Sequence, residues 1–162
     1  MNELPAWLKH TTVWLLLGLM MFLGVQTWQA RERQTRFSFD GQTVEIRRAA
    51  DGHYHWVGRL AGREVEFLVD TGATRTAIPM RLAEELGLPS VGTTQSATAG
   101  GTVQGQVVVG ALELDGGVRA ERLHIVVLPQ LHAPLLGMDV LGRLRWQQEG
   151  GVLRFQLQGT GR

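Results

Sequence analysis

Residues 67–79 read FLVDTGATRTAIP, so an acid, a hydroxyl and a glycine follow directly on an apolar run. The apolar residues predict a strand that becomes buried as it approaches Asp70, which places this carboxyl group at the mouth of a core. An ionised carboxylate there is costly unless hydrogen-bond donors or a water molecule surround it. Gly72 permits a sharp turn that brings amide groups close, and the hydroxyl of Thr71 can tie the loop to another backbone.

The tripeptide Asp-Thr-Gly is weak evidence by itself, because it is expected by chance in roughly one chain of this size in ten to twenty. In a chance match Asp70 would only cap a turn. A second motif lies downstream, where residues 134–144 read PLLGMDVLGRL, an apolar pair and a glycine that lead into a short helix. The two motifs together resemble the retropepsin-like aspartic proteases of clan AA, most closely the bacterial membrane-anchored type. The resemblance covers about residues 51–157.

This resemblance implies an all-β fold, the closed β-barrel of the acid proteases with two short helices, and it implies roles for particular residues. Asp70 would be the catalytic aspartate, Thr71 would lock two active-site loops together through its hydroxyl, and the backbone of Gly72 would meet the substrate. The other assignments are Ala73 and Thr74 in the active-site loop, Ala99, Gly100, Gly101 and Thr102 in a flap hairpin that closes over bound peptide, and Leu135, Leu136 and Gly137 as support behind the catalytic loop.

The sequence departs from the viral members of the family at two positions. Those members carry an acid at the position of Thr74 and an arginine at the position of Met138, and the two charges pair. Both residues are uncharged here, and their joint loss is coherent because losing one alone would leave a charge without its partner. The substrate preferences of viral relatives are therefore no guide to this chain.

Aspartic proteolysis requires a second carboxylate, because the reaction uses two acids that share one proton. The remaining aspartates, none of which begins Asp-Thr-Gly or Asp-Ser-Gly, are Asp40, Asp51, Asp115 and Asp139. Asp115 comes nearest, in LDGG, but a hairpin turn is the favoured interpretation there. The sequence therefore predicts a two-fold symmetric homodimer with one Asp70 from each chain at the axis.

Short strands separated by glycine-rich turns are predicted for most of the chain after residue 36. The predicted strands cover residues 43–48, 53–60, 64–70, 93–99, 102–109, 111–115, 118–128 and 152–157. One helix is predicted for PMRLAEELG, between Pro79 and Gly87, and a second for MDVLGRL, after Gly137. Many strands with little helix indicate a compact barrel or sandwich.

The N-terminal tail, residues 1–30, contains an uncharged apolar run, TTVWLLLGLMMFLGV, at residues 11–25. A helix between Trp7 and Trp28 would rise roughly 30 Å, about the thickness of the hydrocarbon layer. We therefore expect a single transmembrane helix over about residues 11–28, then a linker and first strand over 31–50 and the protease domain over 51–158. The alternative is a cleaved signal peptide, which is disfavoured because bulky Trp28 stands where cleavage needs a small residue.

The orientation of this anchor has two conflicting indications. More positive charge flanks the span on its C-terminal side, which favours a cytoplasmic domain. A long following domain can override that count, and the resemblance to bacterial members favours a single-pass inner-membrane protein with its domain in the periplasm. The periplasmic orientation is the one we expect.

Composition excludes several other classes of function. The chain of 162 residues has a net charge of +1 and no cysteine, which leaves no thiol chemistry and no basic patch suited to nucleic acid. His53 and His55 would share a strand face, but without a third ligand nearby a metal site is not expected. The glycines of AGGTVQGQVVVG lack the lysine and hydroxyl of a phosphate-binding loop. No cofactor is therefore expected.

Two functions from different classes remain. The first is a membrane-anchored aspartic endopeptidase, a hydrolase that cleaves extended peptide segments of proteins by water attack. The alternative is a catalytically inactive dimer of the same fold that binds peptides or acts as a scaffold at the membrane. The intact Asp-Thr-Gly favours the endopeptidase, because a binding module has little need of a costly pair of acids.

Overall fold

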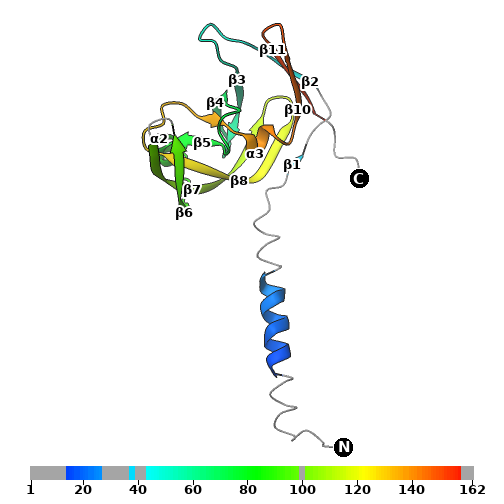
Figure 1. Ribbon diagram of the computed structural model, residues 1–162, viewed down its shortest axis with the longest axis vertical. Helices are drawn as coiled ribbons and strands as arrows, with labels where there is room; N and C mark the ends of the chain where they lie inside the picture. The colour runs from blue at the N-terminus through cyan, green and yellow to red at the C-terminus, as the bar shows by residue number, and fades with distance from the viewer. Residues whose placement is uncertain (1–13, 27–36, 39–42, 99–100, 158–162) are drawn as a thin grey trace, which may run out of the picture. The chain divides into compact units, whose positions relative to one another are not determined.

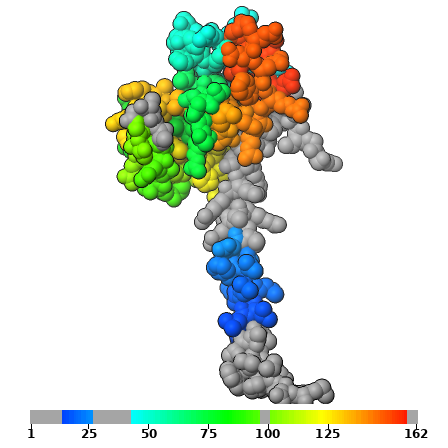
Figure 2. All heavy atoms as spheres, in the orientation of Figure 1, coloured from blue at the N-terminus to red at the C-terminus, as the bar shows by residue number. Residues whose placement is uncertain are grey.

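The computed structural model describes residues 14–26, 37–38, 43–98 and 101–157 (Figure 1). The chain divides into two compact units, Met1–Gln34 and Thr35–Arg162. In the first unit residues 14–26 form a helix, whose apolar side chains are exposed and are drawn in blue in Figure 2. No helix among the described residues has both the length and the hydropathy that crossing a membrane requires.

The second unit is built mainly of strands, coloured from cyan to red in Figure 1. Its elements, in chain order, are β1 (Phe37–Ser38), β2 (Thr43–Arg47), β3 (His55–Leu60), β4 (Arg63–Val69), β5 (Ala77–Pro79), α2 (Met80–Glu85), β6 (Ser90–Thr98), β7 (Gly101–Leu114), β8 (Val118–Leu128), β9 (Leu135–Leu136), α3 (Met138–Leu141), β10 (Arg145–Glu149) and β11 (Val152–Gln156).

Six of these strands close into a barrel. Neighbouring strands in the main sheet follow the order β8, β5, β9, β4, β3 and β7, and the further pairing of β7 with β8 completes the ring. Strands β1 and β6 extend this sheet from β8 and β7, and a separate sheet holds β10, β11 and β2. The predicted closed β-barrel is confirmed, and so are the two short helices, α2 after Pro79 and α3 after Gly137.

Aromatic side chains join the small sheet to the barrel. Trp56 on β3 and Phe155 on β11 are almost fully buried, with ring centroids 4.4 Å apart. The indole of Trp56 donates a hydrogen bond to the carbonyl oxygen of Asp115, at 2.9 Å. Burying one such side chain stabilises a fold by roughly 1.5–3 kcal/mol. Trp56 also lies opposite Phe67 in the β3–β4 ladder, so the core holds β4 three residues before Asp70.

Several strands differ from the prediction. The two strands expected at residues 102–109 and 111–115 form one strand, β7, with a shift in register between Gly110 and Leu112. Strands β1, β5 and β9 have only two or three residues each, too few for an alternating pattern to appear. All five residues of β10 are exposed, so the sequence there shows no alternation of buried and exposed residues. The strand is recognised only by its pairing with β11.

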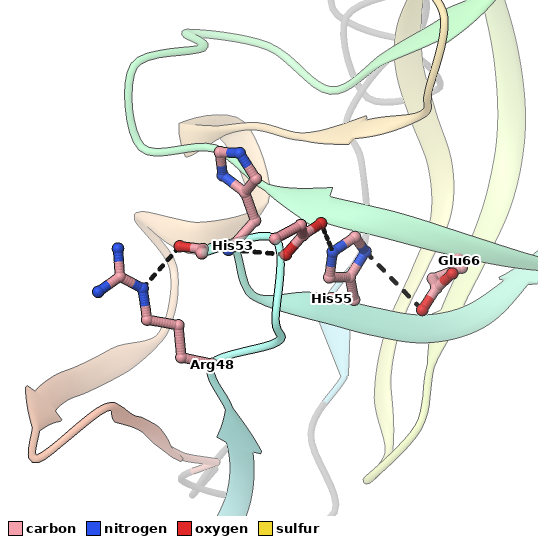
Figure 3. Close-up of polar contacts among 6 residues, drawn as sticks. Arg48, His53, His55 and Glu66 are labelled. Atoms are coloured by element: carbon pink, nitrogen blue, oxygen red, sulfur yellow. Dashed lines mark hydrogen bonds and ion pairs between the residues drawn. The ribbon is translucent and has the colours of Figure 1, made fainter.

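The two histidines do not share a strand face, and this part of the prediction is wrong. Strand β3 begins at His55, and His53 lies in the preceding turn (Figure 3). The carboxylate of Asp51 closes that turn: Oδ1 accepts the backbone N–H of His53 at 2.9 Å, and Oδ2 lies 2.8 Å from Nε2 of His55. The first of these bonds, followed by the second, lowers the pKa of Asp51 below its ordinary value.

This turn connects to the strand that ends at Asp70. The guanidinium of Arg48 donates to the carbonyl oxygen of Gly52 at 2.7 Å, and Nδ1 of His55 lies 3.8 Å from a carboxylate oxygen of Glu66 on β4 (Figure 3). Tyr54 lies between the two histidines, and its carbonyl oxygen accepts the backbone N–H of Val69 at 2.9 Å. The turn therefore supports the last residue of β4.

Candidate active site

Asp70 follows directly on β4 and is half-buried. Its backbone N–H donates to the carbonyl oxygen of Leu136 at 3.0 Å, and its Oδ1 accepts the backbone N–H of Gly72 at 2.9 Å. A Cβ atom on residue 72 would lie 3.2 Å from that same Oδ1, closer than an ordinary contact. Glycine therefore lets the amide reach the carboxylate, and the donor expected from Gly72 is in place.

Strand β9 supports the end of β4. The two run parallel, with Leu135 opposite Leu68 and Leu136 opposite Val69. Leu136 is fully buried, whereas Leu135 is half-buried and also lines the cavity that contains Asp70. The structure thus brings the downstream apolar pair beside the Asp-Thr-Gly loop, as the sequence predicts.

The burial of β4 does not increase toward Asp70 as expected. Phe67 is its last fully buried side chain, and Leu68 and Val69 are only half-buried.

Gly137 stands where two backbones meet. A Cβ atom on this residue would lie 2.3 Å from the carbonyl carbon of Arg75 and 2.7 Å from the amide nitrogen of Thr76. Real Cβ atoms do not approach backbone atoms so closely, because the repulsion rises steeply at such distances. The close approach expected of Gly137 therefore has a direct geometric basis.

A buried polar clasp, formed by Thr76 and Asp139, joins the same two segments. Oδ1 of Asp139 accepts the hydroxyl of Thr76 at 2.8 Å and its backbone N–H at 2.9 Å. The hydroxyl in turn accepts the backbone N–H of Gly137 at 3.2 Å. Thr76 is fully buried, so each of these groups needs its partner.

Neither residue of this clasp was predicted. Thr76 and Asp139 are 63 residues apart, and Asp139 was considered only as a possible second catalytic acid. The one signal available was the position of Thr76, a polar residue immediately before the apolar residues of β5. That signal indicates a buried hydroxyl but not its partner.

Asp70 opens onto a groove of about 730 Å³. Its lining comprises the active-site loop (Asp70, Gly72, Ala73, Thr74, Arg75), one stretch of β6 (Thr94, Gln95, Ser96) and an apolar wall (Ala77, Val126, Leu128, Leu131, Leu135). Among these residues Asp70 is the only acid and Arg75 the only base. The described lining of the groove is thus mostly uncharged, with one carboxylate among it.

The β6–β7 hairpin supplies the segment predicted as the flap. Strand pairing continues to its tip, where Thr98 lies opposite Gly101. Gly101 has a φ of +111°, a conformation that favours glycine, and Thr102 follows it on β7. Ala99 and Gly100 lie outside the described residues. The β6 arm of this hairpin lines the groove through Thr94, Gln95 and Ser96.

The remaining predicted residues occupy the loop after Asp70. Thr71 is exposed, and its hydroxyl makes no hydrogen bond within the described parts of the chain. The carbonyl oxygens of Ala73 and Thr74 accept the backbone N–H groups of Met138 and Asp139, at 2.8 and 3.2 Å. These two backbone bonds join the active-site loop to the start of α3.

The fold and this loop together define the class of an acid-protease barrel. The sequence model of the family described as gag-polyprotein putative aspartyl protease matches residues 57–143, which is more than half of the chain. The chain belongs to this family, and it is an aspartic protease by family. No curated protein matches the sequence.

Solved structures share the fold. A retropepsin-like aspartic protease from Rickettsia conorii aligns with a TM-score of 0.58 and 20% identity, over 76% of this chain and 94% of that one. The EIAV protease in complex with the inhibitor HBY-793 aligns with a TM-score of 0.51 and 18% identity, over 58% of this chain and 89% of that one. At these identities the likeness concerns the fold.

Gly137→Ala should destabilise the protein by about 2–3 kcal/mol, because the new methyl group must displace the backbone of Arg75 and Thr76. Urea unfolding of the full chain in detergent, followed by tryptophan fluorescence, measures the change. Gly92→Ala is the matched control, since a Cβ there meets nothing within 4 Å. Equal free energies of unfolding for the two variants would contradict the proposed close contact.

Asp139→Leu should lower the free energy of unfolding by roughly 2–4 kcal/mol, because it leaves the buried hydroxyl and N–H of Thr76 without an acceptor. Asp139→Asn keeps an oxygen at the position of Oδ1 and should cost much less. Adding Thr76→Val to Asp139→Leu should recover part of the loss, since the orphaned hydroxyl is then absent. Additive losses in the double variant would show that the two side chains are not coupled.

Proposed function

We propose that this protein is a membrane-anchored aspartic endopeptidase, active as a homodimer in which each chain contributes one Asp70. The observation that carries the proposal is the position of Asp70: its carboxylate accepts the amide of Gly72 and lines the groove of about 730 Å³. Membership of an aspartic protease family gives that geometry its chemical meaning.

The need for two chains follows from the acids that line the groove. Asp70 is the only one of them, and the reaction requires two carboxylates that share a proton. Asp115 lies in the turn between β7 and β8 and lines a different cavity, of about 350 Å³. A second copy related by a two-fold axis would supply the missing acid and would place one exposed Thr71 beside the other.

Each carboxyl group would then have a distinct task in the reaction. The ionised one removes a proton from a water molecule, whose oxygen attacks the carbonyl carbon of the peptide bond. The protonated one donates its proton to the carbonyl oxygen. The resulting tetrahedral intermediate breaks at the C–N bond: the carboxyl group that took the proton from water gives it to the amine nitrogen, and the other carboxylate recovers a proton from a hydroxyl group of the intermediate.

The groove favours an extended peptide as substrate. Strand β6 forms the edge of the main sheet and pairs only with β7 among the described strands. Its residues Thr94, Gln95 and Ser96 line the groove, and an edge strand offers backbone groups to which an extended peptide can add. The apolar wall opposite would accept apolar side chains of that peptide.

The helix over residues 14–26 supports the proposed anchor, since large apolar side chains run along it and are at least 41% exposed. The uncharged run extends to residue 11, and Trp28 follows it. A span over about residues 11–28 would therefore be apolar along its length, with a tryptophan near one interface. Two chains held in one membrane would pair at a higher effective concentration. We place the anchor in the inner membrane with the protease domain in the periplasm.

Asp70→Asn should reduce cleavage of unfolded protein substrates by roughly 10²- to 10⁴-fold, because the proton transfer is lost. Asp115→Asn is the matched control and should retain activity. If both chains are needed, wild type and Asp70→Asn refolded together in equal amounts should show about one quarter of the activity of the same total amount of wild type. The reason is that only pairs of two wild-type chains carry both acids.

Three outcomes of this experiment would decide against the proposal. Equal cleavage by wild type and Asp70→Asn would remove Asp70 from the chemistry. Half of the activity in the mixture, with monomers in sedimentation, would exclude the dimer. A wild-type dimer that binds peptides but cleaves none from acid to neutral pH would establish the inactive scaffold instead.

Leu19→Arg should release the full chain from membranes, because a charge at the centre of a span raises the cost of insertion by about 2.5–3.5 kcal/mol. Extraction at alkaline pH measures this, and Gln147→Arg on exposed β10 is a control with the same added charge. Wild-type protein in the supernatant would exclude the anchor. A reporter that functions only outside the cytoplasm, fused after Arg162, reads the orientation.

A further inference from the structure

We propose that Arg75 is a specificity-determining residue that selects peptides carrying an acidic side chain on each side of the cleaved bond. This inference rests on the proposed function, because it concerns what occupies the groove beside Asp70. It begins from the groove lining, in which Arg75 is the only base and Asp70 the only acid among the described residues.

The backbone at Arg75 is held on both sides. Its carbonyl group packs against Gly137, and the next residue, Thr76, is bound through its amide and hydroxyl to Asp139. The preceding residue, Thr74, accepts the backbone N–H of Asp139. The guanidinium therefore projects from a fixed backbone beside the catalytic loop. Binding a ligand to it then costs less conformational entropy.

The guanidinium of Arg75 has no acidic partner in the part of the chain that the structure describes. The residue is exposed, and it forms neither a hydrogen bond nor an ion pair with Asp70 or with any other described side chain. Some other arginines of the barrel unit are paired with a carboxylate, for example Arg119 with Glu113 at 2.8 Å, whereas Arg59, on the separate cavity, has no such pair among the described residues. Arg75 is thus a cation on the groove that remains available to a ligand.

A carboxylate is the group that this site would recognise. A guanidinium presents planar donors that match the two oxygens of a carboxylate, and such a pair strengthens when a bound peptide excludes water around it. Apart from Asp70, the rest of the lining offers apolar contacts and neutral polar groups, which carry no positive charge to favour glutamate over glutamine. Charge selection in this groove therefore falls to Arg75.

The two-fold symmetry of the proposed dimer doubles the effect. One Arg75 from each chain lies in each half of the shared groove, at equal distances from the pair of Asp70 carboxylates. An extended peptide that crosses both halves would therefore meet one cation on each side of its cleaved bond. The preferred substrate carries acidic residues on both sides, separated from the cleaved bond by similar lengths of chain.

The test uses a fluorescent octapeptide of alternating apolar and glutamate residues and its twin with glutamine in place of each glutamate. Binding to the full-length Asp70→Asn dimer is measured by fluorescence anisotropy, which does not require cleavage. We expect the glutamate peptide to bind about three- to tenfold more tightly for each acid engaged, and this ratio to shrink as salt is raised.

Variants of Arg75 in the same background assign the effect. Arg75→Met should bring the ratio of the two dissociation constants to about one, and Arg75→Glu should favour a third twin with lysine at the same positions. Arg59→Met is the matched control, an exposed arginine on β3 that lines the separate cavity, and it should keep the glutamate preference. Unfolding curves establish that each variant is folded.

Two results would overturn the inference: equal or absent binding of the glutamate and glutamine peptides, or a glutamate preference that survives in Arg75→Met. Failure of the proposed function would look different, because wild-type protein would then cleave neither peptide while the Asp70→Asn protein still discriminated between them. Where wild type does cleave, the ratio of kcat/KM for the two peptides should follow the binding ratio.

Discussion

Two backbone segments meet at Gly137 at a distance that no side chain would permit. A Cβ there would fall 2.3 Å from the carbonyl carbon of Arg75, so glycine is a condition for the closure of β9 onto the active-site loop. From this contact follow the parallel pairing of β4 with β9, the bond from Asp70 to Leu136, and the burial of Thr76 against Asp139. These contacts between β4, β9 and the active-site loop hold Asp70 in place, and the backbone N–H of Asp70 and the hydroxyl of Thr76 both have hydrogen-bond partners.

One chain by itself would leave the proposed active site without its second carboxylate. The groove holds one carboxylate, an exposed threonine beside it and one unpaired guanidinium, and none of these is explained by packing within the described chain. A closed barrel satisfies its own strands, so groups left exposed at its groove are available for other molecules. In the proposed dimer, catalysis, chain pairing and charge selection would depend on neighbouring residues of a single loop, which a second chain and a peptide would both contact.

Sequence reasoning succeeded where chemistry restricts the choice of residues. Asp70 with Gly72, and Leu136 with Gly137, occur in orders that few other structures require, so the barrel and the adjacency of the two motifs could be predicted. Sequence patterns did not reveal strands that lack a hydrophobic period. Strands β5 and β9 are too short to show one, and β10 has no buried face. The histidines were misplaced because Asp51 closes a turn that strand periodicity does not reveal.

The order of residues alone predicted an acid loop, its supporting motif, a barrel or sandwich of short strands and the lack of a second Asp-Thr-Gly, and the family resemblance then indicated the closed barrel. Tertiary structure decided which side chains surround the acid. The clasp of Thr76 with Asp139 spans 63 residues, and the groove draws on the loop, β6 and β8 together. Such contacts depend on the register of strands distant in the chain, and register is set by the packing of the whole core, which no local pattern contains.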